Sequence, residues 1–275
     1  MNDKVKSEDM KKFETSYKVG LVATLDENGD PHISLLSTLM AKSEREMMLG
    51  KFIAGESKKN LLRDPKAGFL IMSLEKEFWT GKMTFTHILT NGEDYDLYNQ
   101  QPIYRYNSYF GIDSVYYLDL VEISEGRKLD MAGIVANSLR VMLSRGRYKQ
   151  ASTLGALKPW ALELMRKMDT LAFISFVDKD GYPALVPCIQ LQAADTDTLV
   201  LSNAPYKAEL SAIKAGSRVA VFGANLKFES VLMKGEFSGF EGGLATVKLD
   251  RVYNSMPPKH GYIFDAKASL RTAAL

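Results

Sequence analysis

The sequence of 275 residues contains a single cysteine, Cys188, so no disulfide can form within the chain. This scarcity is typical of proteins that fold in a reducing cytoplasm. Cys188 lies in an apolar run and has no basic neighbour in the sequence. These surroundings favour a small buried hydrophobic residue over a reactive nucleophile.

Long apolar runs and an excess of one charge are also missing. No apolar run approaches the roughly 18 residues that a membrane-spanning helix needs, and the charged residues 1–9 lack the apolar core of a secretory signal. The 35 basic and 33 acidic residues leave a net charge of +2, which indicates neither a nucleic-acid nor a membrane partner. We therefore expect a cytoplasmic protein of ordinary globular composition, 46% hydrophobic and 25% charged.

The residue patterns of several enzyme classes are absent as well. There is no G-x-S-x-G, Walker loop or G-x-G-x-x-G. The histidines His32, His87 and His260 are scattered without metal-ligand spacing, so we expect no metal. We interpret His32 as a surface residue of a hairpin, while His87 ends a strand and could reach a ligand pocket. The carboxylates of residues 91–96 follow a glycine and predict a solvated loop.

The most informative stretch is Gly50–Pro65, which follows the apolar run of residues 47–49. It predicts a strand, a turn and a short helix from Lys58 that ends before Pro65, because the residue before a proline avoids the α region. Ser57 is placed as the N-cap of this helix. A helix start with a hydroxyl and lysines is suited to a phosphate, although a capped helix with solvated lysines explains the same residues.

The pattern of strands and turns occurs twice. Asn28-Gly29 separates two apolar runs and predicts a tight hairpin, as does Asp180-Gly181. The turns are 181 − 29 = 152 residues apart, and Lys207 follows Lys58 by 149 residues. Each copy predicts six strands with one short helix after the third strand. A duplicated domain accounts for this correspondence, with repeats at residues 1–127 and 169–275 and connecting helices at residues 128–168.

Residues 129–168 have helical periodicity. Their apolar residues recur at spacings of three and four and predict one buried face: Met131, Ile134, Val135, Leu139, Met142 and Leu143. A second helical segment follows Pro159. Packing against the repeats is the preferred interpretation, and a methionine-rich face for a partner is the alternative.

Six antiparallel strands and one helix describe a small split or closed β-barrel. The order and spacing of four motifs resemble the FMN-binding split-barrel superfamily, the pyridoxamine 5′-phosphate oxidase-like group. These motifs are Asn28-Gly-Asp-Pro-His-Ile-Ser34, Gly50 to Ser57-Lys-Lys-Asn-Leu61, Asp64-Pro65 and Trp79-Thr-Gly81. The resemblance implies a mainly β fold with helices (α+β), in which two tandem split barrels form an intrachain pseudo-dimer and joining them raises their effective concentration.

The resemblance also implies an FMN site on the first repeat. Carried over by position, strand two offers Ser34 and Ser37, strand three offers Gly50 and Lys51, and the helix offers Ser57, Lys58 and Asn60, while Trp79 and Lys82 lie on a strand near the flavin ring. The aromatic stretch 101–112 could form a lid with Arg105, Tyr106 and Asn107. Packing of these rings against the barrel is the alternative.

The second repeat departs from this pattern. Val186, Ile189, Tyr206 and Glu209 stand at the positions of Ser34, Ser37, Ser57 and Asn60. A carboxylate would repel a phosphate dianion, so we expect one competent site per chain. The tail, residues 260–271, lacks the arginine–histidine pair that closes the substrate site of pyridoxamine phosphate oxidase, so we do not expect that activity.

The resemblance therefore implies an FMN-dependent oxidoreductase, with nicotinamide or another small molecule as electron donor. No catalytic side chain is assigned, because the cofactor carries the chemistry. One alternative is a flavin or haem carrier without turnover. Another is a cofactor-free barrel that acts as an interaction protein. Both a monomeric pseudo-dimer and a homodimer agree with the sequence.

Overall fold

The computed structural model describes residues 1–14, 18–51, 55–101, 111–150, 154–225, 227, 229–254 and 261–266. Its first sheet contains strands β1 (Lys18–Leu25), β2 (Pro31–Leu35), β3 (Met40–Ala41), β4 (Glu46–Lys51), β5 (Lys66–Ser73), β6 (Glu77–Leu89), β7 (Ser114–Ile123) and β8 (Arg127–Lys128). Its second sheet contains β9 (Leu171–Val177), β10 (Pro183–Pro187), β11 (Gln192–Ala193), β12 (Thr198–Ser202), β13 (Arg218–Ala224), β14 (Ser230–Phe237), β15 (Leu244–Asn254) and β16 (Gly261–Asp265).

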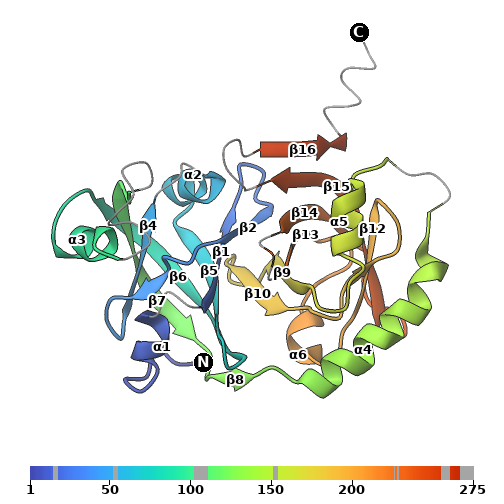
Figure 1. Cartoon of the computed structure of the whole chain (residues 1–275), viewed down its shortest axis with the longest axis horizontal. Coiled ribbons are helices and arrows are strands. Elements are labelled where there is room, and N and C mark those ends of the chain that lie inside the picture. The colour runs from blue at the N-terminus through green and yellow to red at the C-terminus, as the bar shows by residue number, and fades with distance from the viewer. Residues whose placement is uncertain are drawn as a thin grey trace, which may run out of the picture. The chain divides into compact units, whose positions relative to one another are not determined.

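The helices are short apart from one in the middle of the chain (Figure 1). They are α1 (Met10–Glu14), α2 (Glu56–Arg63), α3 (Glu93–Asn99), α4 (Met131–Ser144), the 3-10 turn η1 (Arg145–Tyr148), α5 (Pro159–Leu164) and α6 (Lys207–Leu210). Among the described residues, no helix is both long and apolar enough to cross a bilayer.

The two sheets have the same strand order. The first runs β2-β1-β5-β6-β7-β4-β3 and the second β10-β9-β13-β14-β15-β12-β11. They differ in their last short strand, because β8 pairs with β6 whereas β16 pairs with β15. Six strands of each sheet, β1, β2, β4, β5, β6 and β7 in the first and β9, β10, β12, β13, β14 and β15 in the second, match the six that the sequence predicts. The tandem repetition of the domain is thus confirmed.

Each sheet is strongly curled. The edge strands β2 and β3 follow one another in sequence through residues 36–39 alone, so their facing ends lie within roughly 18 Å. Seven flat strands would instead place these edges roughly 29 Å apart. The same argument applies to β10 and β11, which residues 188–191 connect. Both sheets are therefore split barrels, as predicted.

The predicted hairpins are present in both repeats. Gly29 and Gly181 have φ angles of 76° and 77°, a region that glycine enters without steric cost. In the first turn the backbone N–H of Asn28 donates to Asp26 Oδ1 at 2.9 Å, and in the second the N–H of Asp180 donates to Asp178 at 2.9 Å. The local sequence therefore fixes both turns.

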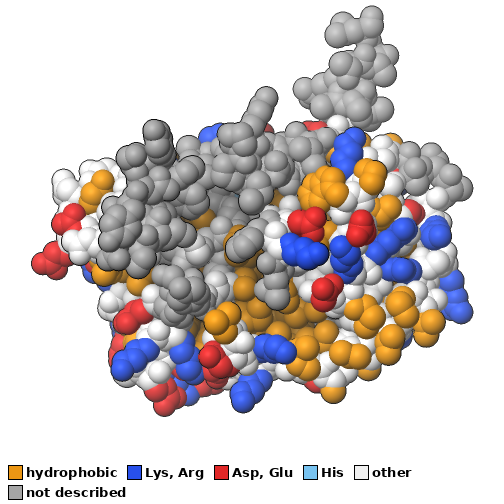
Figure 2. Space-filling view, viewed as in Figure 1, with side chains coloured by type: hydrophobic (Ala, Val, Ile, Leu, Met, Phe, Trp, Pro, Cys, Tyr) orange, Lys and Arg blue, Asp and Glu red, His pale blue; other side chains and the backbone are white. Residues whose placement is uncertain are grey.

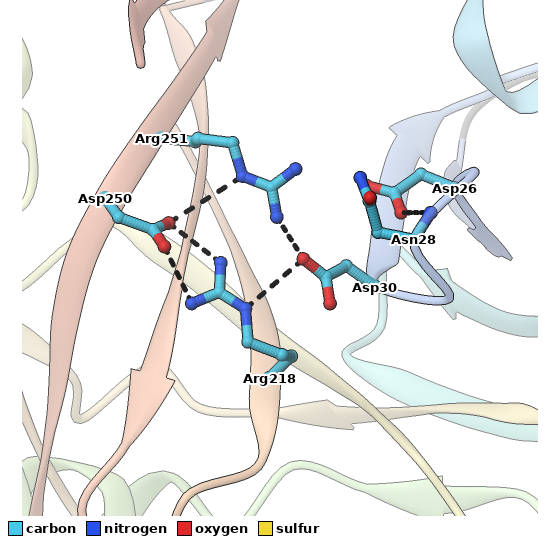
Figure 3. Close-up of polar contacts among 6 residues, drawn as sticks. All are labelled: Asp26, Asn28, Asp30, Arg218, Asp250 and Arg251. Atoms are coloured by element: carbon cyan, nitrogen blue, oxygen red, sulfur yellow. Dashed lines mark hydrogen bonds and ion pairs between the residues drawn. The ribbon is translucent and has the colours of Figure 1, made fainter. Parts of the chain in front are cut away.

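Contacts divide the chain into two compact units. The first comprises Met1–Gly29, Ser34–Leu129 and Gly181–Ala184, and the second comprises Asp30–Ile33, Asp130–Asp180 and Leu185–Leu275. The residue after each hairpin glycine makes a different kind of side-chain contact in its unit. In the second unit, Asp30 accepts from Arg218 and Arg251 (Figure 3). In the first, the hydroxyl of Tyr182 hydrogen bonds to Thr84 at 2.9 Å.

The central segment departs from the predicted packing. Ile134 and Val141 are buried in α4, but Met131, Val135, Leu139, Met142 and Leu143 are exposed, so the predicted buried face is wrong for these five. The reason is polar: Asn137 Oδ1 accepts from Ser202 Oγ, and the carbonyl of Ser138 accepts from Gln192. Because of these contacts, α4 packs on the sheet with the side that carries Asn137 and Ser138, which lies at the edge of the apolar stripe.

Three smaller expectations are also settled. Residues 93–99 form α3 rather than a loop, and the buried Tyr98 anchors this helix by donating to the carbonyl of Thr38 at 2.6 Å. Cys188 is fully buried, as expected, and burial raises the pKa of its thiol. His32 is buried rather than superficial, because its ring meets the ring of Tyr253 edge-on at 4.8 Å.

Candidate functional site

The candidate site begins where β2 and α2 meet in the first unit. Ser34 Oγ and Ser57 Oγ lie 2.6 Å apart and share a hydrogen bond. Ser57 is not the N-cap, because α2 starts at Glu56 and Gly55 occupies the cap position without a side-chain cap. The hydroxyl of Ser57 is therefore not used by the helix. It forms a pair of neutral donors with Ser34.

Lys58 lies next to this pair in sequence and is 7% exposed. Burial, together with the nearby Lys51, lowers the pKa of its ammonium to about 8, and Asp113 opposes this shift. Within the described part of the chain, the ammonium of Lys58 makes no hydrogen bond or ion pair. A buried ammonium without an anion is costly, so this position is suited to an anionic ligand.

Lys51, at the end of β4, has an anion of its own. Its Nζ lies 2.9 Å from Asp113 Oδ2, and this hydrogen bond raises the pKa of Lys51. The preceding Gly50 accepts from Thr38 Oγ1 at 2.8 Å through its carbonyl. A Cβ at Gly50 would lie 3.0 Å from Ile112. Glycine thus lets β4 pass close to the segment that carries Asp113.

Asn60 and Ser37, two further residues of the predicted site, have surroundings that differ from those of Lys58. Asn60 is buried, donates to Thr24 Oγ1 at 3.0 Å and accepts from Arg63 at 3.0 Å. These bonds tie α2 to β1 and so hold Lys58 in place. Ser37 is exposed in the turn between β2 and β3.

Trp79 and Lys82, which the resemblance placed near the flavin ring, contact residues outside the set that was predicted to bind the cofactor. Trp79 is 1% exposed in the core, and its indole N–H donates to Asp9 at 3.1 Å. Lys82 Nζ lies 3.0 Å from Glu122 and also faces the ring of Tyr182. Arg105, Tyr106 and Asn107, the predicted lid, lie outside the described residues.

Sequence reasoning missed two members of this neighbourhood, Thr38 and Asp113. Neither belongs to a motif, since Asp113 precedes β7 after a long connection and Thr38 lies in a turn. The sequence repeat does contain one indication of the role of Thr38. Gln190 lies 190 − 38 = 152 residues after Thr38 and donates to the carbonyl of Ser202, which lies 202 − 50 = 152 residues after Gly50.

The corresponding position of the second unit lacks these properties. Lys207 is exposed, and the buried Tyr206 precedes it in place of a serine. Ser202 Oγ donates to Asn137 of α4 at 2.8 Å. At Gly133 a Cβ would lie 3.1 Å from Pro205, so α4 closely approaches this loop. In the second unit, α4 thus contacts the loop at the position where the first unit carries the buried Lys58.

His87 does not meet the candidate site through any described contact. Its ring stacks on Tyr117 at 4.5 Å, and the hydroxyl of Tyr117 donates to Asp94 at 2.8 Å. Among the described residues, no three histidine, cysteine, aspartate or glutamate side chains converge as metal ligands.

No protein-family model and no curated protein matches the sequence. Solved structures do show similarity. An FMN-binding protein from Syntrophomonas wolfei is 16% identical, covers 45% of this chain and 85% of its own, and gives a TM-score of 0.35. HupZ from Group A Streptococcus is 18% identical over 43% of this chain and 92% of its own, with a TM-score of 0.36.

A third structure is a protein related to general stress protein 26, of the pyridoxinephosphate oxidase family, from Clostridium acetobutylicum. It is 16% identical over 46% of this chain and 98% of its own, with a TM-score of 0.34. The chain is similar to FMN-binding split-barrel proteins. Each of these structures covers less than half of this chain. At these identities and TM-scores, the likeness assigns no ligand or reaction to this chain.

Proposed function

We propose that this chain is an FMN-binding flavoprotein and that Lys58 holds the phosphate of the cofactor. The observation that carries this proposal is the buried ammonium of Lys58, which has no anionic partner within the described residues. A phosphate dianion would supply the missing charge and receive a charge-assisted hydrogen bond. The sequence motifs that resemble flavin-binding split barrels include this same lysine.

The neighbouring residues fit this role. Ser34 and Ser57 supply two hydroxyls that now bond to each other and can donate to phosphate oxygens instead. The first turn of α2 adds the positive end of the helix dipole. Because Asp113 already pairs with Lys51, Lys58 is the lysine available to a ligand.

Bound FMN supplies hydride and single-electron chemistry, while the protein determines its position and its electrostatic surroundings. We therefore propose an oxidoreductase whose own residues bind and orient the flavin. A nicotinamide or another small molecule is the proposed electron donor. Rapid bleaching of the bound flavin by NADH or NADPH would support an enzyme, and a flavin that neither donor reduces would favour a carrier.

The binding proposal is tested by titrating FMN and riboflavin, which differ only by the phosphate, and following flavin absorbance and fluorescence. We expect FMN to bind more tightly and Lys58→Met to weaken FMN roughly 10- to 100-fold, as loss of a charged hydrogen bond does. Riboflavin binding should be unchanged by this variant. Equal affinity of the wild type for the two flavins would refute a phosphate site.

A neighbouring lysine provides the matched control. Lys59 follows Lys58 on α2, but its side chain is 65% exposed and pairs with Glu56. Lys59→Met removes the same charge from the same helix, so it should change FMN affinity less than twofold because the lost charge is solvated. Lys58→Arg should retain part of the affinity. If both methionine variants weakened FMN equally, general electrostatics rather than a Lys58 site would explain binding.

A further inference from the structure

Helix α4 presents an apolar stripe to solvent. Its side toward the sheet carries the buried Ile134, Ser138 and Val141. Beside them are five large apolar side chains with high exposed fractions: Met131 (42%), Val135 (48%), Leu139 (42%), Met142 (38%) and Leu143 (79%). Figure 2 shows a row of hydrophobic side chains over α4 at the lower right. Soluble monomers rarely expose so continuous an apolar patch, which marks an interaction surface.

The spacing of this stripe is that of a helix–helix seam. Ala132, Val135, Leu139 and Met142 follow one another at intervals of three, four and three residues. This is the a/d pattern with which one α-helix packs along another. The seam combines the small Ala132 with larger side chains, which suits close packing of two helices.

We infer that α4 pairs in antiparallel orientation with α4 of a second copy of this chain. The seam is self-complementary in one register. With Val135 of one copy opposite Leu139 of the other, Ala132 faces Met142 and Met131 faces Leu143. All five exposed apolar residues then meet apolar residues of the other copy. A two-fold axis makes each contact occur twice, as in the commonest type of homodimer.

The charges at the two ends of the helix select the antiparallel orientation. Asp130 precedes α4 and is exposed, while Arg145 and Arg147 follow its C-terminal end. The antiparallel register brings Asp130 of one copy near the exposed Arg147 of the other. A parallel pair would instead place the arginines of both copies together.

A second copy accounts for the stripe better than an anionic membrane does. The arginines closest to the stripe already have partners within their unit. Arg140 donates to the carbonyl of Gly242, and Arg145 Nη1 donates to Gln192 Oε1 at 2.9 Å. An interfacial helix that binds anionic lipids needs cations directed toward the headgroups. Here Arg140 and Arg145 bond to acceptors of their own unit, and the stripe beside them is apolar.

The oligomeric state tests this inference directly. Light scattering of the full chain over a concentration series should give a dimer mass, and Leu139→Glu or Leu143→Glu should raise the dissociation constant of the dimer at least about tenfold. The control is Leu74→Glu, which changes a leucine that is 73% exposed in the first unit and should leave the dimer unchanged. A wild type that is monomeric throughout, or a dimer that both α4 variants retain, would overturn the inference.

Disulfide trapping tests the register and the orientation. The native Cys188 is fully buried, so introduced cysteines are the ones that can cross-link. A mixture of Val135→Cys and Leu139→Cys chains should yield a covalent heterodimer, because these positions face each other in the antiparallel pair. In a parallel pair each variant would instead cross-link with itself. Self-cross-linking without the heterodimer, or vesicle binding by a monomer, would exclude the proposed arrangement.

Discussion

Arg218 Nε donates to Asp30 Oδ2 across 3.2 Å, although 188 positions separate the two residues in the chain. Arg251 donates to the same carboxylate oxygen, and Arg218 also pairs with Asp250 at 2.8 Å (Figure 3). The side chains of Asp30 and Arg251 are 11% and 9% exposed. One carboxylate from the first hairpin thus pairs with two arginines of the second unit, and Asp250 supplies the second negative charge.

Replacing Asp30 by Asn should therefore destabilise the protein strongly. The variant leaves the largely buried Arg251 with the more distant carboxylate of Asp250, at 3.8 Å, and breaking a buried ion pair from one side costs about 3 kcal/mol. Urea unfolding measures this loss. Asp3→Asn is the matched control, because its pair with Arg45 is more than 60% exposed on both sides and should contribute less than about 1 kcal/mol. Equal midpoints for the two variants would contradict a structural role of the network.

The second prediction concerns Gly68 in β5, where a Cβ would collide with the backbone carbonyl of Pro183 within the first unit. A carbonyl cannot rotate away as a side chain can, so Gly68→Ala should cost about 1–3 kcal/mol, the usual effect of overpacking. Thermal unfolding measures the change. Gly146→Ala is the control, since nothing lies within 4 Å of a Cβ there. A neutral Gly68 variant would mean that the two segments are not in contact.

The elements that could be predicted from the sequence are those determined by neighbouring residues. Gly29 and Gly181 determine their hairpins through positive φ angles, and α2 ends at Arg63, just before Asp64 and Pro65. The duplicated pattern then predicts the repeated fold, because each copy carries the same turns. Of the candidate site, the sequence locates Ser34, Ser57 and Lys58 through their motifs.

What the sequence could not predict depends on contacts between distant residues. His32 is buried because the ring of Tyr253, far along the chain, packs against it. Periodicity along α4 reveals which residues are apolar. It cannot reveal that bonds from Asn137 and Ser138 turn another side of the helix toward the sheet. For the same reason no local pattern indicated that Asp113 pairs with Lys51.

The number of flavins per chain is the third prediction. At the two corresponding positions that the structure describes, the first unit combines a buried lysine with a pair of serine hydroxyls, whereas in the second Lys207 is exposed and Tyr206 replaces the serine. Saturation with FMN should therefore load one flavin per chain. Lys58→Met should abolish tight loading, whereas Lys207→Met should leave it unchanged. Absorbance of the flavin released by denaturation measures the ratio, and two flavins per chain would contradict the asymmetry.

The fourth prediction follows from the buried charge of Lys58. Burial lowers the pKa of Lys58 to about 8 from its ordinary value of 10.5. Below pH 8 both the folded and the unfolded chain hold this proton, so the group makes no contribution to the pH dependence of stability. Between pH 8 and 10.5 only the unfolded chain holds it, so the free energy of unfolding rises with pH, by about 3 kcal/mol in all.

Comparison with Lys58→Met isolates this contribution. Lys18 is a second buried lysine with a pKa of about 8, and it remains in both proteins. The difference between the unfolding free energies of wild type and variant should therefore be constant below pH 8 and shift in favour of the wild type as pH rises to 10.5. Saturating FMN should suppress this shift, because a bound phosphate stabilises the protonated ammonium and raises its pKa. A difference independent of pH would show that Lys58 is solvated, and the case for a phosphate at this position would then fail.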